Sequence, residues 1–315
     1  MNYLFIVYLA GGSVCLYFGA EWLVKGSSRL ALSLGVSTLV VGLTIVAFGT
    51  SAPELVVSMI AGINKSGGIA VGNVVGSNIF NIALILGISS IIRPLKVNIK
   101  IIRIDAPFLV MISLLLWFIL KNHYVSRTEA SFLFSGILLY TVLTVYFGRK
   151  NTAEMNILTS GKVEKFNFRN LIIDIALIAA GLVGLVAGSR LFVKGAVDLA
   201  HLLKISETII GLTIVSAGTS LPELATSVIA SFKGEEDIAV GNIIGSNIFN
   251  ILAILGAAGL VTPLSFSGIG IVDMAVMCGT TMLLLPLMRT GFRINRFEGL
   301  LLLFIYGFYM VYLVA

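Results

Sequence analysis

Two glutamates stand inside strongly apolar sequence, each at the end of the same short polar motif. Glu54 closes GTSAPE at 49–54, and Glu223 closes GTSLPE at 218–223. A charged side chain at the centre of a membrane helix costs about 2.5–3.5 kcal/mol on insertion scales, so two of them are not kept for packing. The apolar segments around them contain no lysine or arginine, which argues against an internal salt bridge. A bound cation is the simplest compensation.

A proline precedes each glutamate and favours a local break in the helix. Pro53 and Pro222 cannot donate a hydrogen bond to the carbonyl four residues earlier, which belongs to Gly49 and Gly218 respectively. Carbonyl oxygens freed beside a carboxylate are hard ligands of the kind that Na⁺ and Ca²⁺ prefer.

More polar residues follow at helical spacing. Steps of three and four place these residues on one stripe of each motif helix: Ala47, Thr50, Ser51, Glu54 and Ser58, and Ser216, Thr219, Ser220, Glu223 and Ser227. Steps of four on the next helix align Asn73, Ser77 and Asn81, and Asn242, Ser246 and Asn250. Glycine pairs on these helices allow close approach, so both stripes could share one ion. Hydrogen bonding between helices is the simpler interpretation for a subset: Ser58, Ser227, Asn73, Asn78, Asn242 and Asn247.

Both motifs belong to a longer duplication. Residues 42–87 and 211–256 align without a gap and are identical at more than half of their positions. Glu54 pairs with Glu223 and Asn81 with Asn250 at the same offset. A duplicated polar site inside apolar sequence is typical of a transporter built from two repeats.

The composition excludes a soluble protein. Of the 315 residues, 58% are hydrophobic and 11% are charged, against roughly 25% charged in a soluble domain. Although the net charge is +6, the basic residues lie in short loops between apolar segments, so they set membrane orientation and no nucleic-acid partner is expected. The lone Cys15 and Cys278 are expected to be packing residues.

The pattern predicts an all-α integral membrane protein with ten transmembrane helices. The predicted spans are 3–21, 36–60, 68–91, 104–121, 130–148, 170–189, 206–232, 238–260, 270–288 and 297–314. Because five is odd, the second set of five helices starts on the opposite side of the membrane, and the two repeats are inverted. The expected units are the first repeat (1–149), a connector (150–169) and the second repeat (170–315).

The basic residues predict the orientation. With both termini extracellular, the cytoplasmic loops hold 15 of the 21 lysines and arginines, as the positive-inside rule requires. We therefore expect a multi-pass cell-membrane protein with its connector in the cytoplasm. Asp105 and Asp273 are interpreted as charges at helix N-termini, and Tyr309 as an interfacial anchor.

The motifs resemble those of a known family. GTSAPE with GNVVGSNIFN, and GTSLPE with GNIIGSNIFN, are similar to the two α-repeats of the Ca²⁺/cation antiporter superfamily, and within it to prokaryotic Na⁺/Ca²⁺ exchangers. The resemblance covers essentially the whole chain. It implies an antiporter rather than an enzyme, acting as a monomer without a cofactor and driving Ca²⁺ out with a Na⁺ gradient.

The resemblance also implies roles for individual residues. It places Ca²⁺ between Glu54 and Glu223, with backbone oxygens of Thr50 and Thr219. It assigns Na⁺ to the same glutamates together with Ser51, Ser220, Ser77 and Ser246, and the carbonyls near Ala47 and Ser216. It puts Asn81 and Asn250 at the central position and makes the first and sixth helices a sliding gate.

K⁺ dependence is not expected from these residues. Some relatives carry an acid at one of the two asparagine positions, whereas this chain has Asn81 and Asn250 there.

Three alternatives stay open at this point. A proton/calcium exchanger is the main alternative, because both glutamates could bind protons. A passive channel and an intramembrane enzyme with paired acids are the others.

Overall fold

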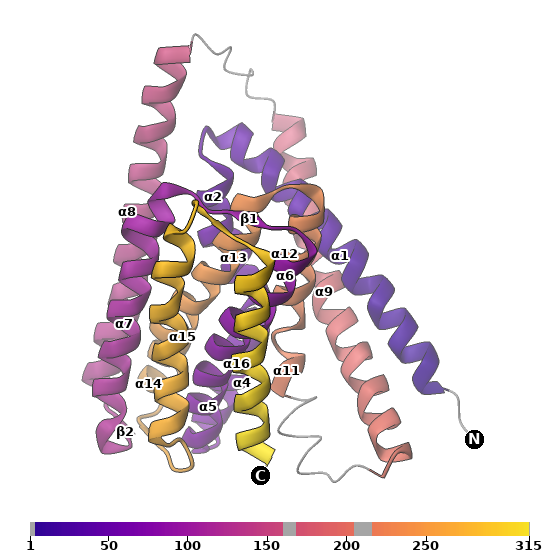
Figure 1. Cartoon of the computed structure of the whole chain (residues 1–315), viewed down its shortest axis with the longest axis vertical. Coiled ribbons are helices and arrows are strands. Elements are labelled where there is room, and N and C mark those ends of the chain that lie inside the picture. The colour runs from indigo at the N-terminus through magenta and orange to yellow at the C-terminus, as the bar shows by residue number, and fades with distance from the viewer. Residues whose placement is uncertain (1–3, 160–167, 205–215, 315) are drawn as a thin grey trace.

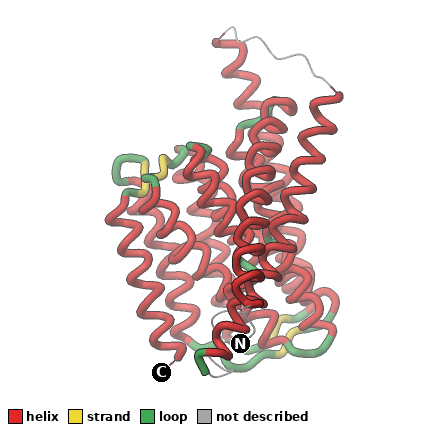
Figure 2. The backbone as a smooth tube through the Cα atoms, turned by 90° about the vertical axis from the view of Figure 1, so that its right-hand side faces the viewer, coloured by secondary structure: helices red, strands yellow, loops and turns green. Residues whose placement is uncertain are grey.

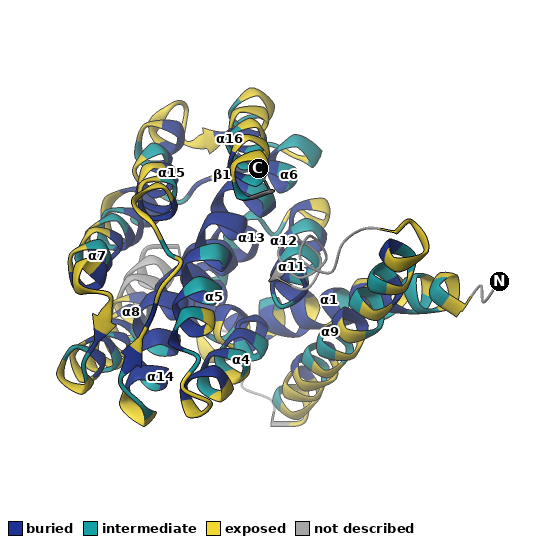
Figure 3. Cartoon of the chain, turned by 90° about the horizontal axis from the view of Figure 1, so that it is seen from below, coloured by how far each residue is buried: buried dark blue, intermediate teal, exposed yellow. Residues whose placement is uncertain are grey.

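The computed structural model describes residues 4–159, 168–204 and 216–314, which are almost entirely helical. The first half opens on the long helix α1 (Leu4–Leu34), and the second half opens on its counterpart, α9 (Phe168–Leu202). These two helices lie side by side on one flank of the molecule (Figure 1; Figure 3). Both are longer than the spans predicted for them, 3–21 and 170–189.

Two bent or irregular helices of each half form the inner layer. In the first half, α2 (Thr38–Val41), the π-helical η1 (Gly42–Val46) and α3 (Ala47–Thr50) run to a break at Ser51. Helix α4 (Ala52–Ile63) then continues at an angle of 47°. The next segment consists of α5 (Gly67–Ile79), the π-helical η2 (Phe80–Leu86) and α6 (Gly87–Ile92).

The second half repeats this inner layer. Its described elements are α11 (Ser216–Gly218), α12 (Leu221–Lys233), α13 (Glu236–Phe249), the π-helical η6 (Asn250–Ile254) and α14 (Leu255–Val261). Every residue of α13 from Ile238 to Phe249 is buried, so this helix lies at the centre of the molecule (Figure 3). Asn81 and Asn250 both lie at the start of a π-helical segment, a distortion often found at functional sites.

Four further helices form the outer layer on the side away from α1 and α9. They are α7 (Ala106–Ile119), flanked by the π-helical η3 (Ile101–Asp105) and the 3₁₀ turn η4 (Leu120–Asn122), then α8 (Arg127–Thr159), α15 (Ile271–Arg289) and α16 (Arg296–Val314). Two short antiparallel strand pairs join the repeats. Strand β1 (Leu95–Lys96) pairs with β4 (Arg293–Ile294), and β2 (Tyr124–Val125) pairs with β3 (Leu264–Ser265).

The predicted all-α membrane fold is confirmed. One of the ten predicted spans is not counted below, because part of it lies outside the described residues. Eight described helices are long and apolar enough to cross a membrane, and the bent pair Thr38–Thr50 and Ala52–Ile63 makes a ninth if it is one span. The remaining predicted span, 206–232, begins within 205–215, which lies outside the described residues, and α12 is its described part.

The described loops gather at two ends, in the grouping that alternating spans require. The β1–β4 pair lies at one end, where Glu21 of α1 also contacts Lys233 of α12 at 2.7 Å. Both chain termini lie at the opposite end (Figure 2). The described parts of the loops assigned to the cytoplasm therefore lie together, and so do the described parts of those assigned to the exterior.

Two predictions about outer residues need correction. Asp105 does not begin its helix, because the π-helical turn from Ile101 precedes it, and it is buried and accepts a hydrogen bond from Tyr140 at 3.0 Å. Tyr309 is not an interfacial anchor, because it is buried and donates to Asp273 at 2.9 Å. Asp273 does lie in the first turn of α15, where it accepts from the backbone N–H of Gly270.

Candidate ion-binding site

Each motif breaks its helix just before the glutamate, as the prolines predicted. Ser51 (φ −84°, ψ 5°) and Ser220 (φ −92°, ψ 8°) have nearly the same non-helical backbone. A new helix begins after each serine, with proline in its first two positions and the glutamate in its first turn. Proline suits this position because its missing N–H would have no partner in the first turn.

The two breaks meet, and each repeat donates a hydrogen bond to the glutamate of the other. The Ser51 hydroxyl donates to Glu223 Oε1 at 2.8 Å, and the Ser220 hydroxyl donates to Glu54 Oε1 at 2.8 Å. Glu54 is 1% exposed and Glu223 is fully buried. The two carboxylates that the sequence predicted to share a site are therefore held together at the contact between the repeats.

Among the described residues, the second oxygen of each carboxylate has no hydrogen-bond partner. Glu54 Oε2 and Glu223 Oε2 are buried without a hydrogen bond. The ion pairs in the described ranges join Arg93 to Glu236 and Lys233 to Glu21, so neither site glutamate has a basic partner there. Leaving buried charged oxygen atoms unpaired is costly, and a cation placed between them would remove that cost.

Unpartnered oxygens also occur on the neighbouring inner helices. Asn81 Oδ1, Asn250 Oδ1 and Ser246 Oγ are all buried without a hydrogen bond. Neutral oxygen atoms beside carboxylates make a donor set suited to Na⁺ or Ca²⁺, both of which prefer oxygen ligands. The described residues contain no group of three or more histidine, cysteine or acidic side chains that could hold a metal. A cation here would therefore depend on hydroxyl, amide and carbonyl oxygens as well as on the two carboxylates.

Two asparagines attach the motif helices to their neighbours. Asn73 Nδ2 donates to the Glu54 carbonyl at 3.2 Å and to Ser58 Oγ at 2.9 Å. Asn242 Nδ2 makes the equivalent bonds, to the Glu223 carbonyl at 3.5 Å and to Ser227 Oγ at 3.1 Å. These contacts confirm the interhelical interpretation of the four side chains concerned.

The other predicted ligands are placed as follows. Thr50 Oγ1 donates to Asn242 Oδ1 at 3.0 Å. The Ser77 and Ser220 hydroxyl oxygens lie 3.2 Å apart, and Ser77 is the donor of this pair because the one hydroxyl hydrogen of Ser220 goes to Glu54. The Ala47 carbonyl accepts from the Ser51 N–H at 3.0 Å and lies 3.3 Å from Thr50 Oγ1, whose one hydrogen is shared with the shorter bond to Asn242. Thr219 lies half-buried beside Ser220. The backbone of Ser216 belongs to α11, and its side chain lies outside what the structure describes.

Sequence reasoning did not name the partner of Asn78, a residue interpreted as hydrogen bonding between helices. Asn78 accepts a hydrogen bond from Asn250 Nδ2 at 3.1 Å, across the contact between the repeats. Its own Nδ2 lies 3.9 Å from the sulfur of Met277 on α15. Helical spacing could not have found this pair, because the two asparagines are 172 residues apart.

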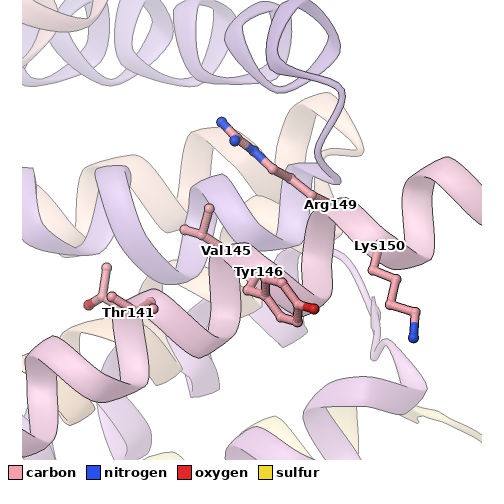
Figure 4. A pocket seen from close by; sticks show the side chains of 6 residues that line it. Thr141, Val145, Tyr146, Arg149 and Lys150 are labelled. Carbon is pink, nitrogen blue, oxygen red and sulfur yellow. The ribbon is translucent and has the colours of Figure 1, made fainter.

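The site is closed in this structure. Two hollows on the described surface lie elsewhere: a groove of about 710 Å³ along α8, lined by Val145, Tyr146 and Arg149 among others (Figure 4), and one of about 920 Å³ beside Trp117 and Phe266. Neither is lined by a motif residue. Because both glutamates are almost unexposed, an ion can reach them or leave them only after helices move.

Comparison with known proteins shows that the chain is similar to sodium/calcium exchangers over nearly its whole length. The chain is 35% identical to the sodium/calcium exchanger MaX1 of Methanosarcina acetivorans, over 96% of each chain, and 36% identical to the inner membrane protein YrbG of Escherichia coli, over 80% of this chain and 78% of that one. It superposes on the sodium-calcium exchanger NCX_Mj, in crystals soaked with Na⁺ and Ca²⁺, with a TM-score of 0.85, 33% identity and 99% coverage of both chains.

The family assignment follows from a match to both halves of the chain. The sodium/calcium exchanger protein family model matches residues 4–147 and 173–315. The proteins of this family are membrane transporters and not enzymes. With the duplicated motif, the paired buried glutamates and the shared architecture, this protein belongs to the sodium/calcium exchanger family.

Proposed function

We propose that this protein is a sodium/calcium antiporter, in which a Na⁺ gradient drives Ca²⁺ out of the cell through the site between Glu54 and Glu223. The observation that supports it is a pair of buried carboxylates, one from each repeat, each with an oxygen atom that no described residue binds. Such a pair requires a cation, and its hard oxygen surroundings suit Na⁺ and Ca²⁺.

The charge of the site explains why transport should be an exchange. Two carboxylates in a poorly solvated site repel each other when no cation is bound. One Ca²⁺ or two Na⁺ cancels their charge, so a loaded site is near neutral and the protein can change state around it at low cost. The empty site stays charged and is trapped, which couples the movement of one ion to the return of the other.

The ligands that we propose come from equivalent positions of the two repeats. Ca²⁺ binds the two glutamates and backbone oxygens of Thr50 and Thr219. The Na⁺ sites use the same glutamates, with oxygens from Ser51, Ser220, Ser77, Ser246, Ala47, Ser216, Asn81 and Asn250. In this proposal 1–149 and 170–315 are the two transmembrane repeats, and 150–169 is the connector between them.

The moving part in this proposal is the pair α1 and α9. These helices lie against the inner layer from outside and pack on each other through glycines, so they can shift together without separating. The excess of basic residues in the loops beside the connector supports cytoplasmic placement of that end and extracellular termini. We infer that one chain contains a complete site and acts as a monomer in the cell membrane.

Radioactive Ca²⁺ uptake into proteoliposomes tests the function. Vesicles loaded with Na⁺ and diluted into Na⁺-free medium should accumulate Ca²⁺, whereas vesicles loaded with K⁺ should not. Uptake driven by an imposed pH gradient alone would identify a proton/calcium exchanger instead. Ca²⁺ entry without Na⁺ inside the vesicles would indicate a channel.

A further inference from the structure

We propose that Asn78 is a positioning residue of the ion site, which holds the Asn250 amide with its oxygen toward the transported cation. The proposal rests on the function proposed above and adds a residue outside the two motif stripes. Asn78 and Asn250 are each 1% exposed, and the hydrogen bond between them, 3.1 Å long, crosses from the first repeat to the second.

The orientation of this pair follows from what each partner can accept. The Met277 thioether can only accept a hydrogen bond, so the amide end of Asn78 that faces it, at 3.9 Å, is the NH₂ group. The carbonyl end of Asn78 then faces Asn250 and accepts from its NH₂ group. Asn250 is left with its oxygen pointing away from Asn78, buried and without a hydrogen-bond partner among the residues that the structure describes.

The segment that begins with Asn250 packs against the helix that carries the motif glutamate of the first repeat. Asn250 begins η6, and η6 packs against α4, whose first turn holds Glu54. A rotation of the Asn250 amide by half a turn would present an NH₂ group in place of the oxygen, and N–H donors repel cations. The orientation of the Asn250 amide therefore decides whether this side chain offers the cation an oxygen ligand or a repelling NH₂ group.

Asn247, the equivalent of Asn78 in the second repeat, makes no such described contact with an asparagine of the opposite repeat. Asn247 stands where Asn78 stands, but its Nδ2 donates to the Ile243 carbonyl of its own helix at 2.7 Å. Among the described contacts, the amide pair between the repeats is thus made on one side only. Asn247 is of the same residue type and equally buried, which makes it a matched control.

Na⁺ should depend on this oxygen more than Ca²⁺ does, because the divalent ion gains more from the two carboxylates and relies less on neutral ligands. Asn78→Ala should raise the Na⁺ concentration for half-maximal exchange about tenfold, as loss of one ion–dipole ligand implies. The corresponding Ca²⁺ concentration should change less, and the maximal rate should stay within about twofold. Met277→Leu, which removes only the sulfur acceptor, should shift the Na⁺ value in the same direction by a smaller factor.

The decisive experiment combines Asn78→Ala with Asn250→Asp. Both terminal atoms of a carboxylate are oxygens, so an acid at position 250 needs no orienting partner, and Asn78→Ala should have no further effect on the Na⁺ value in that background. Asn247→Ala should leave the wild-type Na⁺ value unchanged. Monodisperse elution and an unchanged thermal midpoint would establish that each variant is folded.

The outcomes separate this inference from the proposed function. A shift that persists undiminished in the Asn250→Asp background, or an Asn78→Ala variant that loses maximal rate with an unchanged Na⁺ value, would make Asn78 a packing residue. Wild-type vesicles without Na⁺-dependent Ca²⁺ uptake would instead overturn the proposed function and this role with it.

Discussion

Glu54 and Glu223 are bound in reciprocal fashion, each by a serine hydroxyl of the opposite repeat. One oxygen of each is satisfied in this way and one is not. The serines therefore hold the carboxylates in place while leaving one oxygen of each available for a cation. A ligand that must release its ion repeatedly needs this fixed position, because a carboxylate free to rotate would lose orientation each time the site emptied.

Removing either charge should abolish exchange. Glu54→Gln and Glu223→Gln keep the size of the side chain and its hydrogen bond to serine, but leave one negative charge to face a divalent ion. We expect Na⁺-dependent Ca²⁺ uptake to fall to background in both variants. Asp198→Asn, the same change at an exposed position on α9, is the matched control and should retain exchange. Normal exchange by either glutamine variant would contradict a shared site.

At the scale of elements, the contact between α1 and α9 is made by glycines. A methyl group on Gly12 would lie 2.6 Å from the Phe192 nitrogen, and one on Gly188 would lie 2.8 Å from the Leu16 nitrogen. Gly11, the next residue on α1, has nothing within 4 Å of the same position. The two helices thus touch through backbone along one face, as small residues in membrane helices permit.

This difference between neighbouring glycines gives a sharp test. Gly12→Val should force the helices apart and destabilise the protein by about 1–3 kcal/mol, the usual cost of overpacking, with a large loss of transport. Gly11→Val, at the preceding position, where a side chain meets open space, should change neither property appreciably. The thermal midpoint in detergent and Ca²⁺ uptake check both effects. Equal behaviour of the two variants would mean that α1 and α9 do not move as one packed unit.

At the scale of the whole molecule, the polar contacts between α1 and the end of α12 differ from those at the equivalent positions of the opposite repeat. At the end of the β1–β4 pair, Glu21 pairs with Lys233 at 2.7 Å and Ser28 donates to Glu235 at 3.0 Å. In the opposite repeat, Arg190 stands at the position equivalent to Glu21, and Asn64 at the position equivalent to Lys233. These two residues cannot form an ion pair. An ion pair that has no counterpart at the equivalent described positions biases a two-state protein toward the state in which its own end is closed.

Breaking this contact should favour opening at the same end. Both side chains are about one-third exposed, so Lys233→Gln should cost the closed state about 0.2–1 kcal/mol, a shift in population of up to about fivefold. A cysteine introduced by Ser231→Cys, at a buried position on α12 beside this end, should then react faster with a charged thiol reagent. The charge swap Glu21→Lys with Lys233→Glu should restore the slow rate. A swap that behaves like the single variant would rule out the ion pair as the cause.

The sequence alone determined the class of protein, the inverted duplication and the two glutamates. These features are local or repetitive: apolar length marks a span, proline after a Gly-Thr-Ser run marks a break, and a charge without a basic partner marks a cation. They hold whatever the arrangement of the helices. The grouping of loops at two ends followed as well, because each crossing of the membrane reverses the side.

Only the tertiary structure decided which atoms meet. The Ser51–Glu223 and Asn78–Asn250 contacts each join residues 172 positions apart, and the pairing of Tyr309 with Asp273 removes that tyrosine from the interface. The two copies of the motif are nearly alike in sequence, yet Asn78 bonds across the repeats while Asn247 bonds within its own helix. Partner choice in a buried polar cluster depends on the packing of several helices at once, and residue spacing along one helix carries no information about it.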